Sequence, residues 1–260
     1  MHLNFLSTMK KYILILIFTF LSVSALPWGA TGHRVTGYIA DKHLSKKARL
    51  AMQRILGQQS LAMASTWMDD VKSDSLYDMY EDWHWVTIED HETYDQAKKN
   101  PKGDIIDALE KIINELKSKK LSAKEEAERI KMLIHLVGDI HQPFHVGRAD
   151  RGGNDVKLTW FGGNSNLHRV WDSDMIDGTR LSYTELAESL YKPNTTEIKQ
   201  WQHSSVRDWA KESMTYRKQT YDYGNGKLGY QYQYKYFYIV RERLAQAGIR
   251  LAGLLNEIYG

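Results

Sequence analysis

The sequence predicts an all-α, mainly helical single domain that carries one minor β-hairpin. Apolar residues recur at helical spacing over long stretches, most clearly in residues 104–117 and 230–259. Alternation with a period of two is confined to residues 154–162, which include a glycine-rich turn. No internal repeat or low-complexity linker divides the chain. Most of the domain is therefore expected to be helical, with the hairpin as a minor β-element.

The expected elements follow one another closely along the chain. We expect helices, in chain order, at residues 35–44, 46–56, 60–78, 104–117, 123–141, 167–177, 182–191, 195–220 and 230–259. Ser45 is a suitable N-cap for the second helix. Ser122 and Glu125 form a capping-box pattern that opens the helix over residues 123–141. The aromatic and β-branched run W-H-W-V-T-I at 83–88 predicts either a short extended segment or a brief strand.

The first 27 residues have the pattern of a secretory signal peptide. A basic start precedes an apolar run that is too short for a membrane span, and V-S-A follows it. This pattern predicts signal-peptidase cleavage after Ala25, which leaves Leu26-Pro27 ahead of Trp28. We expect a second step, by a dipeptidyl aminopeptidase, to remove that pair. The mature domain would then span residues 28–260, outside the cytoplasm, as a secreted or periplasmic protein without a membrane partner.

Charge and cysteine content exclude several classes of protein. The whole chain has 35 basic and 32 acidic residues, a net charge of +3. Removal of residues 1–27 takes away Lys10 and Lys11 and no acidic residue, so the charge falls to +1. A nearly neutral protein does not bind nucleic acid through bulk charge. There is no cysteine, which excludes thiolate metal sites and structural zinc fingers.

The stretch from Lys131 to Asn154 carries the densest group of candidate metal ligands in the sequence. His135 and Asp139 stand four residues apart, so a helix projects both from one face. Pro143 cannot continue that helix, and His145 follows where the backbone must turn. Two imidazoles and a carboxylate directed at a common point favour a divalent metal such as zinc. The alternative for this stretch alone is a core helix with one hydrogen-bonded His–Asp pair.

Further candidate ligands lie elsewhere in the chain. His168 and Asp172 repeat the four-residue spacing, His84 lies between two tryptophans, and Asp69 follows W-M. His33 ends W-G-A-T-G-H. One metal would leave half of these residues unexplained, so the sequence favours more than one.

An ordered set of motifs resembles the three-zinc, single-strand-specific type I nucleases. The matching pieces are W-G-A-T-G-H (28–33), W-M-D-D (67–70), W-H-W (83–85), H-L-V-G-D (135–139), Q-P-F-H (142–145), R-G-G-N (151–154), N-L-H-R-V-W-D (166–172) and A-G-I-R-L-A-G-L-L-N (247–256). They run in family order from Trp28 nearly to the end of the chain. A single His-x3-Asp would be weak support, whereas the ordered set is specific.

The resemblance implies three Zn²⁺ ions in one cleft. It assigns Asp69, His84, His135 and Asp139 to the first ion. The second would be held by His33, Asp139 and Trp28, the last through its free α-amino nitrogen and its carbonyl oxygen. His145, His168 and Asp172 would hold the third. Asp139 then bridges two ions, which requires a carboxylate at that position.

The resemblance also implies roles toward the substrate. Trp85 matches an aromatic that stacks a nucleobase, although core packing is an equal alternative. Asp69, Lys72 and Asn154 are the expected catalytic residues, with Lys72 and Asn154 acting on phosphate oxygens. Thr87 departs from relatives that have Asp or Asn there, so a base preference is not carried over. His141 has no counterpart among the ligands and is expected to make a hydrogen bond at the helix end.

The implied activity is hydrolysis of single-stranded DNA and RNA to 5′-phosphate products, with 3′-nucleotidase activity on nucleotides as an addition. We expect the enzyme to act as a monomer. The alternative enzyme is a zinc phospholipase C, a class with a similar fold and metal set. Asp172, in place of the Glu typical of the lipases, favours the nuclease. A non-catalytic binding protein would lack at least one ligand, and all nine are present.

Overall fold

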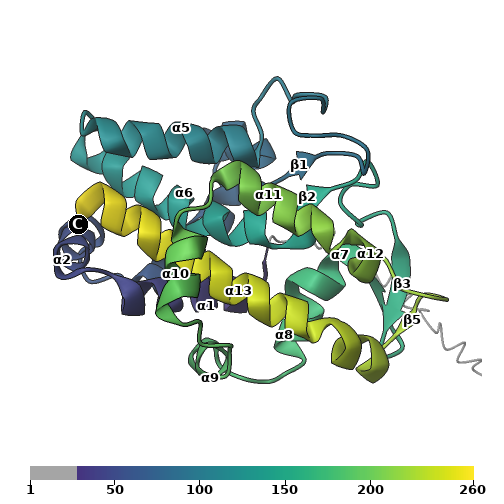
Figure 1. The fold of residues 1–260 in the computed structure, drawn as a ribbon. Helices are drawn as coiled ribbons and strands as arrows, with labels where there is room; N and C mark the ends of the chain where they lie inside the picture. The colour runs from purple at the N-terminus through teal and green to yellow at the C-terminus, as the bar shows by residue number, and fades with distance from the viewer. Residues whose placement is uncertain (1–27) are drawn as a thin grey trace, which may run out of the picture.

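The structure is a computed structural model that describes residues 28–260, and helices dominate it (Figure 1). The predicted signal peptide, residues 1–27, lies outside the described residues. Within residues 28–260 no helix combines the length and the apolar character needed to cross a membrane. The mainly helical fold class is confirmed.

The helices and strands have the following bounds. The α-helices are α1 (Ala30–His43), α2 (Lys46–Leu56), α3 (Leu61–Ala64), α4 (Trp67–Asp70), α5 (Ile105–Ser118), α6 (Ala123–His141), α7 (Leu167–Arg169), α8 (Met175–Asp177), α9 (Tyr183–Glu188), α10 (Thr195–Gln202), α11 (Val206–Thr215), α12 (Arg217–Thr220) and α13 (Tyr230–Tyr259). The 3₁₀-helices are η1 (Val71–Ser73), η2 (Ser75–His84) and η3 (Pro143–His145), and η4 (Val170–Asp174) is a π-helix. The strands are β1 (Val86–Thr87), β2 (Val146–Gly147), β3 (Lys157–Trp160), β4 (Gly163–Asn166) and β5 (Lys227–Leu228).

The predicted helix caps are confirmed. The Ser45 side chain accepts a hydrogen bond from the backbone N–H of Ala48 and caps α2. At the start of α6, Ser122 and Glu125 form both hydrogen bonds of a capping box. These local side-chain bonds fix where two of the framework helices begin.

The single helix predicted over residues 60–78 is wrong. The chain forms α3, α4, η1 and the start of η2 instead. Ser60 and Asp74 cap new helical turns, accepting hydrogen bonds from the backbone N–H groups of Met63 and Leu76. Short polar side chains compete for backbone groups in this way and interrupt a helix.

Two other predicted helices differ in extent. The first begins at Ala30, five residues earlier than expected. The segment predicted as one helix over residues 195–220 is divided into α10, α11 and α12. Ser205 opens α11 with a capping box of its own, and the chain bends again at Tyr216 before Arg217.

Small sheets complete the fold. The predicted hairpin is confirmed, because β3 and β4 pair antiparallel around a turn in which Phe161 and Gly162 both have positive φ. Strand β5 extends this sheet on the other side of β3. The extended segment or brief strand predicted over residues 83–88 forms only in part. Trp83 and His84 belong to η2, and Val86–Thr87 form β1, which pairs in parallel with β2.

Two apolar cores support the helices, and the buried apolar residues of α6 belong to the first of them. One core contains the buried faces of α5 and α6 with the C-terminal part of α13, including Leu109, Leu136 and Leu251. The other contains Trp28, Phe144 and Trp171, packed against the N-terminal part of α13. In Figure 1, α13 runs the length of the molecule below α6. The C-terminal end of α6 therefore reaches the place where the two cores meet.

Candidate metal centre and cleft

Histidine and aspartate side chains converge at the C-terminal end of α6. Three groups of them are close enough to hold a metal ion, with ligand atoms within 4.8 Å of one another. The groups are His33, His135 and Asp139; Asp69, His84 and His135; and His145, His168 and Asp172. Every one of the eight side chains expected as metal ligands belongs to a group.

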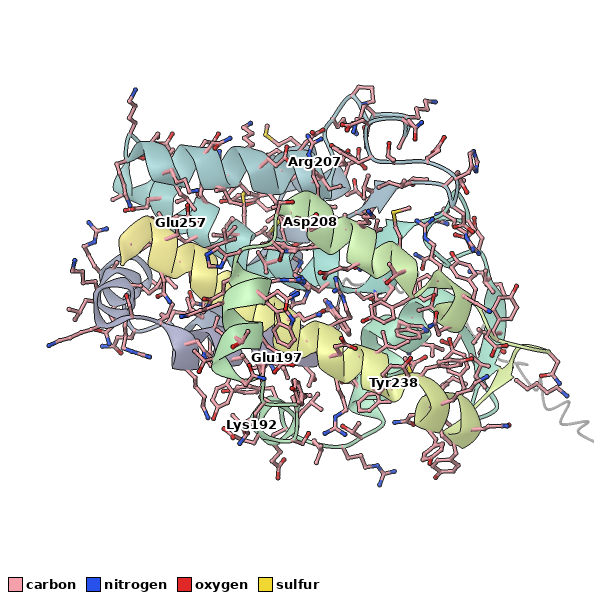
Figure 2. All side chains as sticks on the ribbon, viewed as in Figure 1. Lys192, Glu197, Arg207, Asp208, Tyr238 and Glu257 are labelled. Atoms are coloured by element: carbon pink, nitrogen blue, oxygen red, sulfur yellow. The ribbon has the colours of Figure 1, made fainter. Side chains whose placement is uncertain are left out.

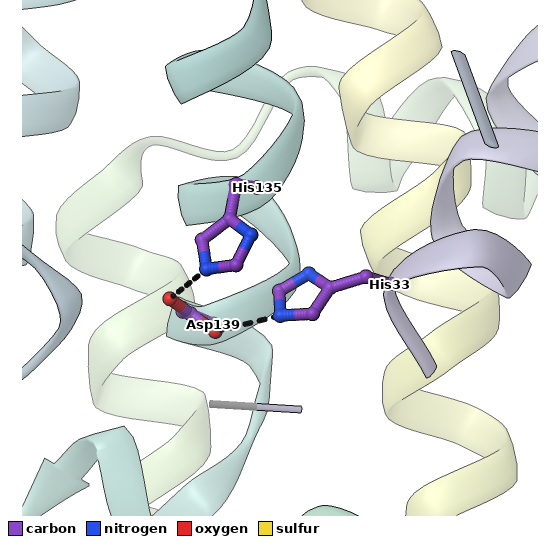
Figure 3. Close-up of side chains that lie close together, drawn as sticks. All are labelled: His33, His135 and Asp139. Atoms are coloured by element: carbon purple, nitrogen blue, oxygen red, sulfur yellow. Dashed lines mark ion pairs between the residues drawn. The ribbon is translucent and has the colours of Figure 1, made fainter. Parts of the chain in front are cut away.

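Asp139 lies at the centre of this arrangement, and its two oxygens face different partners. Oδ1 lies 3.3 Å from Nε2 of His33. Oδ2 lies 2.9 Å from Nδ1 of His84 and 3.2 Å from Nε2 of His135 (Figure 3 shows His33, His135 and Asp139). The His33 and His135 rings stack with their centroids 3.8 Å apart. This is the geometry of a carboxylate between two cation sites.

Glycine at position 138 makes this close packing feasible. A Cβ atom there would lie 2.9 Å from Nδ1 of His33. The same glycine accepts, through its carbonyl oxygen, a 2.7 Å hydrogen bond from the indole N–H of Trp28. Trp28 is thereby held, fully buried, beside the residue that precedes Asp139.

The third group is built where η3 meets the π-helix η4. Nε2 of His168 lies 2.8 Å from Oδ2 of Asp172, and Nε2 of His145 lies 3.4 Å from Oδ1 of the same carboxylate. The Gln142 side chain also donates to Oδ1 of Asp172. Sequence reasoning missed Gln142, although it stands within the Q-P-F-H motif.

Backbone carbonyls fix the orientation of three of the imidazoles. Nδ1 lies within hydrogen-bond distance of a carbonyl oxygen in His135 (Ser65, 2.7 Å), His145 (His84, 2.7 Å) and His168 (Gly152, 2.6 Å). A carbonyl only accepts, so Nδ1 carries the proton in each ring, and the Nε2 lone pair of the neutral ring is directed at the cluster. Metal-ligating histidines are typically held in this way.

The donor set fits metal ions better than it fits hydrogen bonding alone. Six atoms of these residues are buried and make no hydrogen bond within the described chain: Nδ1 and Nε2 of His33, Oδ1 of Asp69, Oδ1 of Asp139, Nε2 of His145 and Oδ2 of Asp172. Most of them lie near an ion-pair partner, but without the direction that a hydrogen bond needs. Buried polar atoms are rarely left unsatisfied in this way. Nitrogen and carboxylate ligands without sulfur suit zinc.

The buried carboxylates and imidazoles shift one another's pKa values. Burial raises the pKa of Asp172, but the charges of His168 and His145 outweigh it and leave the pKa at about 2. Burial lowers the pKa of His145, but the carboxylates of Asp139 and Asp172 raise it to about 9. Burial lowers the pKa of His84 to about 4. Two anionic carboxylates therefore lie among buried imidazoles, and a bound cation would take the place of the protons.

A cleft of about 530 Å³ opens above these groups. Its lining includes the candidate ligands His84 and His145. It also includes the residues expected to contact substrate, Lys72, Trp85 and Asn154, and Thr87, which differs from the Asp or Asn of some relatives. Trp85 is 40% exposed, so its ring is not part of the core. Trp67, Tyr77 and Tyr80 line the cleft as well, and of these only Trp67, the first residue of the W-M-D-D motif, belongs to a motif recognised in the sequence.

Two of the expected catalytic residues have partners inside the protein. Nζ of Lys72 lies 2.6 Å from Oδ1 of Asp69. The Asn154 side-chain amide donates to the carbonyl oxygen of Arg151 at 3.0 Å, which uses one of its two N–H groups. Both residues therefore remain at the cleft wall with hydrogen-bonding capacity for a ligand.

The site and the fold together define a class: a helical protein with several adjacent His/Asp groups, able to hold metal ions, under one cleft. Comparison with protein families matches residues 28–260 to the S1/P1 Nuclease family. The chain belongs to this family, and it is therefore a nuclease. The resemblance expected from the motifs is confirmed.

Individual relatives agree along nearly their whole length. The chain is 29% identical to Endonuclease 3 of Arabidopsis thaliana, over 94% of this chain and 93% of the relative. It is 29% identical to Nuclease S1 of Aspergillus oryzae, over 89% and 91% of the two chains, and 27% identical to Nuclease P1 of Penicillium citrinum, over 90% and 98%. These relatives support a nuclease and do not favour the phospholipase alternative.

Proposed function

We propose that this protein is a zinc-dependent endonuclease that hydrolyses single-stranded DNA and RNA to 5′-phosphate products and also removes 3′-phosphates from nucleotides. One observation carries the proposal most directly: the two oxygens of Asp139 face different histidines within the buried cluster of candidate ligands. A carboxylate so placed suits the shared ligand of a multi-metal phosphodiesterase.

Three zinc ions per chain account for all the converging ligands. Asp69, His84, His135 and Asp139 would hold one ion; His33, Asp139 and the free α-amine and carbonyl of Trp28 a second; and His145, His168 and Asp172 a third. When bound, the ions supply positive charge that lowers the pKa of water and stabilises developing charge on phosphate oxygens. Because this charge is local, the nearly neutral chain has no need of a basic surface to hold an anionic substrate.

The side chains around the metals divide the remaining tasks. Asp69 would help to hold one ion, and its Oδ1 lies 2.6 Å from Nζ of Lys72, which keeps that lysine at the cleft wall. Lys72 would place a point charge on a phosphate oxygen, and Asn154 would donate its free N–H group to another. The exposed ring of Trp85 would stack on a base, which suits a nuclease with little sequence preference. Single strands fit because their bases are free to stack.

Maturation and cellular location are part of the proposal. Residues 1–27 would direct export, giving a secreted or periplasmic monomer that begins at Trp28. Export and processing are thereby coupled to metal binding, because the second ion requires the α-amine of Trp28.

Zinc content and substrate choice together test the proposal. We expect three zinc ions per correctly processed chain by elemental analysis, and faster cleavage of heat-denatured DNA than of the same DNA left native. Phosphatidylcholine serves as the comparison substrate for the lipase chemistry, and size-exclusion chromatography with light scattering gives the mass. One zinc per chain, or preference for phosphatidylcholine, would refute it.

A further inference from the structure

A buried arginine lies behind the cleft, outside the set of expected ligands. Arg217, at the start of α12, is 5% exposed. Its Nη2 atom donates to the carbonyl oxygens of Ile88 at 2.6 Å, Val146 at 2.9 Å and Gly147 at 3.3 Å. Its Nη1 atom donates to Oδ1 of Asp90 at 2.7 Å. One guanidinium therefore ties together two chain segments that are distant in sequence.

Those two segments are the parallel strands β1 and β2 and the residue that follows β1. Val86 pairs with Val146, and the N–H of Ile88 donates to the carbonyl of Gly147 at 3.0 Å. Each strand is only two residues long, so the ladder has few backbone hydrogen bonds of its own. The bonds from Arg217 add a large share of the connections between the strands.

Each strand begins within two residues of a histidine of the metal centre. His84 lies two residues before β1, and His145 immediately precedes β2. Nδ1 of His145 bonds to the carbonyl oxygen of His84 at 2.7 Å. These histidines belong to different metal groups, one with Asp69 and one with Asp172. The spacing of β1 and β2 therefore sets the spacing between the two groups.

The attachment continues to the other wall of the cleft. Asp90 also accepts from Arg148, whose guanidinium lies 4.0 Å from the ring centroid of Tyr221. The Tyr221 hydroxyl donates to Asp150 at 2.9 Å, and Asp150 accepts from the N–H of Gly153 at 2.8 Å. The next residue along the chain, Asn154, lines the cleft.

We propose that Arg217 is a positioning residue that sets the distance between the His84 and His145 metal groups. This inference rests on the proposed function, because the distance matters only if both groups hold metal. Arg217 touches neither ligand side chain, so its effect passes through the carbonyls of the ladder. A guanidinium suits this task, because its planar fork donates in several fixed directions and stays charged when buried.

Loss of the hydrogen bonds from Arg217 to the two strands is expected to lower kcat more than it raises KM. A displacement of about 1 Å between reacting groups costs up to about a hundredfold in rate. Trp85, the proposed base platform, has an additional anchor outside the ladder, because its carbonyl oxygen accepts from the N–H of Ile105 at 3.2 Å. Base stacking on Trp85 should therefore be affected less than the distance between the two metal groups.

Two substitutions at Arg217 and one control test the proposal. Arg217→Met removes the donors at similar length, and Arg217→Lys keeps a charge that cannot reach all the carbonyls. Arg207→Met is the matched control, because Arg207 on α11 (labelled in Figure 2) bonds Glu110 and Asp95 at the surface and does not line the cleft. The readouts are kcat and KM on single-stranded DNA, zinc per chain, and hydrogen exchange of the Ile88 amide with and without zinc.

The expected order of kcat is wild type, then Arg217→Lys, then Arg217→Met, with about a tenfold or larger loss in the last. KM should change less than about threefold, and three zinc ions should remain bound. The Ile88 amide should exchange faster than in wild type in both Arg217 variants. Its exchange rate should be unchanged in Arg207→Met.

A folded Arg217→Met protein with kcat within twofold of wild type, or with unchanged exchange at Ile88, overturns the proposal. If Arg217→Met does not fold, the same two criteria apply to Arg217→Lys. A wild-type protein without zinc or nuclease activity would refute the proposed function instead. Hydrogen exchange at Ile88 would still decide whether Arg217 holds the two strands together.

Discussion

Nη1 of Arg250 donates a hydrogen bond to Nε2 of His141 at 2.9 Å, in a part of the protein from which solvent is excluded. Nδ1 of the same ring bonds to the carbonyl oxygen of Val137 at 2.7 Å. Both ring nitrogens are occupied, which confirms that His141 makes hydrogen bonds at the helix end. Arg250 is the arginine of the A-G-I-R-L-A-G-L-L-N motif, so this contact also explains one residue of that motif.

The first prediction concerns the stability of this cluster. Arg250 also donates to both carboxylate oxygens of Glu212, at 2.7 Å each. Arg250→Met should lower the free energy of unfolding by about 1–3 kcal/mol, because it leaves the buried Nε2 of His141 and Oε1 of Glu212 without a partner, while Arg243 still donates to Oε2 of Glu212. Urea denaturation of the zinc-free protein measures this. The exposed Arg207→Met control should cost less than about 1 kcal/mol. Equal costs for the two variants would contradict the assignment.

The second prediction concerns the bridging carboxylate. Asp139→Asn should lose at least one zinc and nearly all turnover, because an amide oxygen carries no charge to share between two cations. Elemental analysis and initial rates on denatured DNA provide the measurement. Asp95→Asn, at an exposed position, is the control. If the Asp139 variant kept three zinc ions and a near-normal rate, Asp139 would not be the central ligand.

The third prediction concerns base stacking. Trp85→Ala should raise KM for oligonucleotides by the equivalent of about 1–3 kcal/mol, with zinc content and unfolding midpoint unchanged. The 40% exposure of the ring favours this outcome over core packing. Tyr234→Ala is a suitable control, because Tyr234 is 93% exposed and does not line the cleft. Loss of folding in the Trp85 variant would instead support a packing role.

The fourth prediction uses the missing side chain at Gly138. Gly138→Ala should displace His33, because the added methyl would lie 2.9 Å from Nδ1 and 3.2 Å from Cε1 of that ring. We expect weaker binding of one zinc ion, measured by competition with a chelator. Gly163→Ala is the control, since a methyl there meets only the Trp160 carbonyl at 3.5 Å. Unchanged affinity for all zinc ions would show that His33 is not needed as a ligand.

The fifth prediction concerns the N-terminus. Activity should appear only after Leu26-Pro27 has been removed, because an amide nitrogen at Trp28 is a much weaker ligand than a free amine. Intact mass and N-terminal sequencing of the active exported protein test this. Full activity from a chain that still begins at Leu26 would refute two-stage maturation.

Local geometry made much of the site predictable from the sequence. His135 with Asp139, and His168 with Asp172, share a helix face because of their four-residue spacing, and both pairs meet in the structure. The helices with apolar stripes, such as α5 and α13, also lie where expected. Periodicity and capping act within a few residues, so they can be recognised in one sequence.

Long-range contacts were not predictable in this way. The break that divides residues 60–78 follows Ser65, whose carbonyl oxygen bonds to His135 seventy residues away. Arg217 and Arg250 resemble ordinary surface residues in the sequence, but tertiary packing buries both. Their partners are carbonyls and side chains of distant helices, and no local pattern records such a pairing.

The carbonyls that hold His135, His145 and His168 have a consequence for how this centre tolerates change over evolution. The three acceptors belong to the main chain, at Ser65, His84 and Gly152. A point substitution alters a side chain but leaves the peptide oxygen in place. A replacement at Ser65 therefore leaves the orientation of His135 unchanged. At Gly152, however, where φ is +57°, a Cβ atom would collide with the Phe144 carbonyl oxygen, so a replacement there would move the backbone and misalign His168. An insertion or deletion in any of these segments would likewise move an oxygen and misalign a ring. Sequence divergence around the centre is accordingly expected to proceed by replacement at positions other than Gly152, with the lengths of these segments retained.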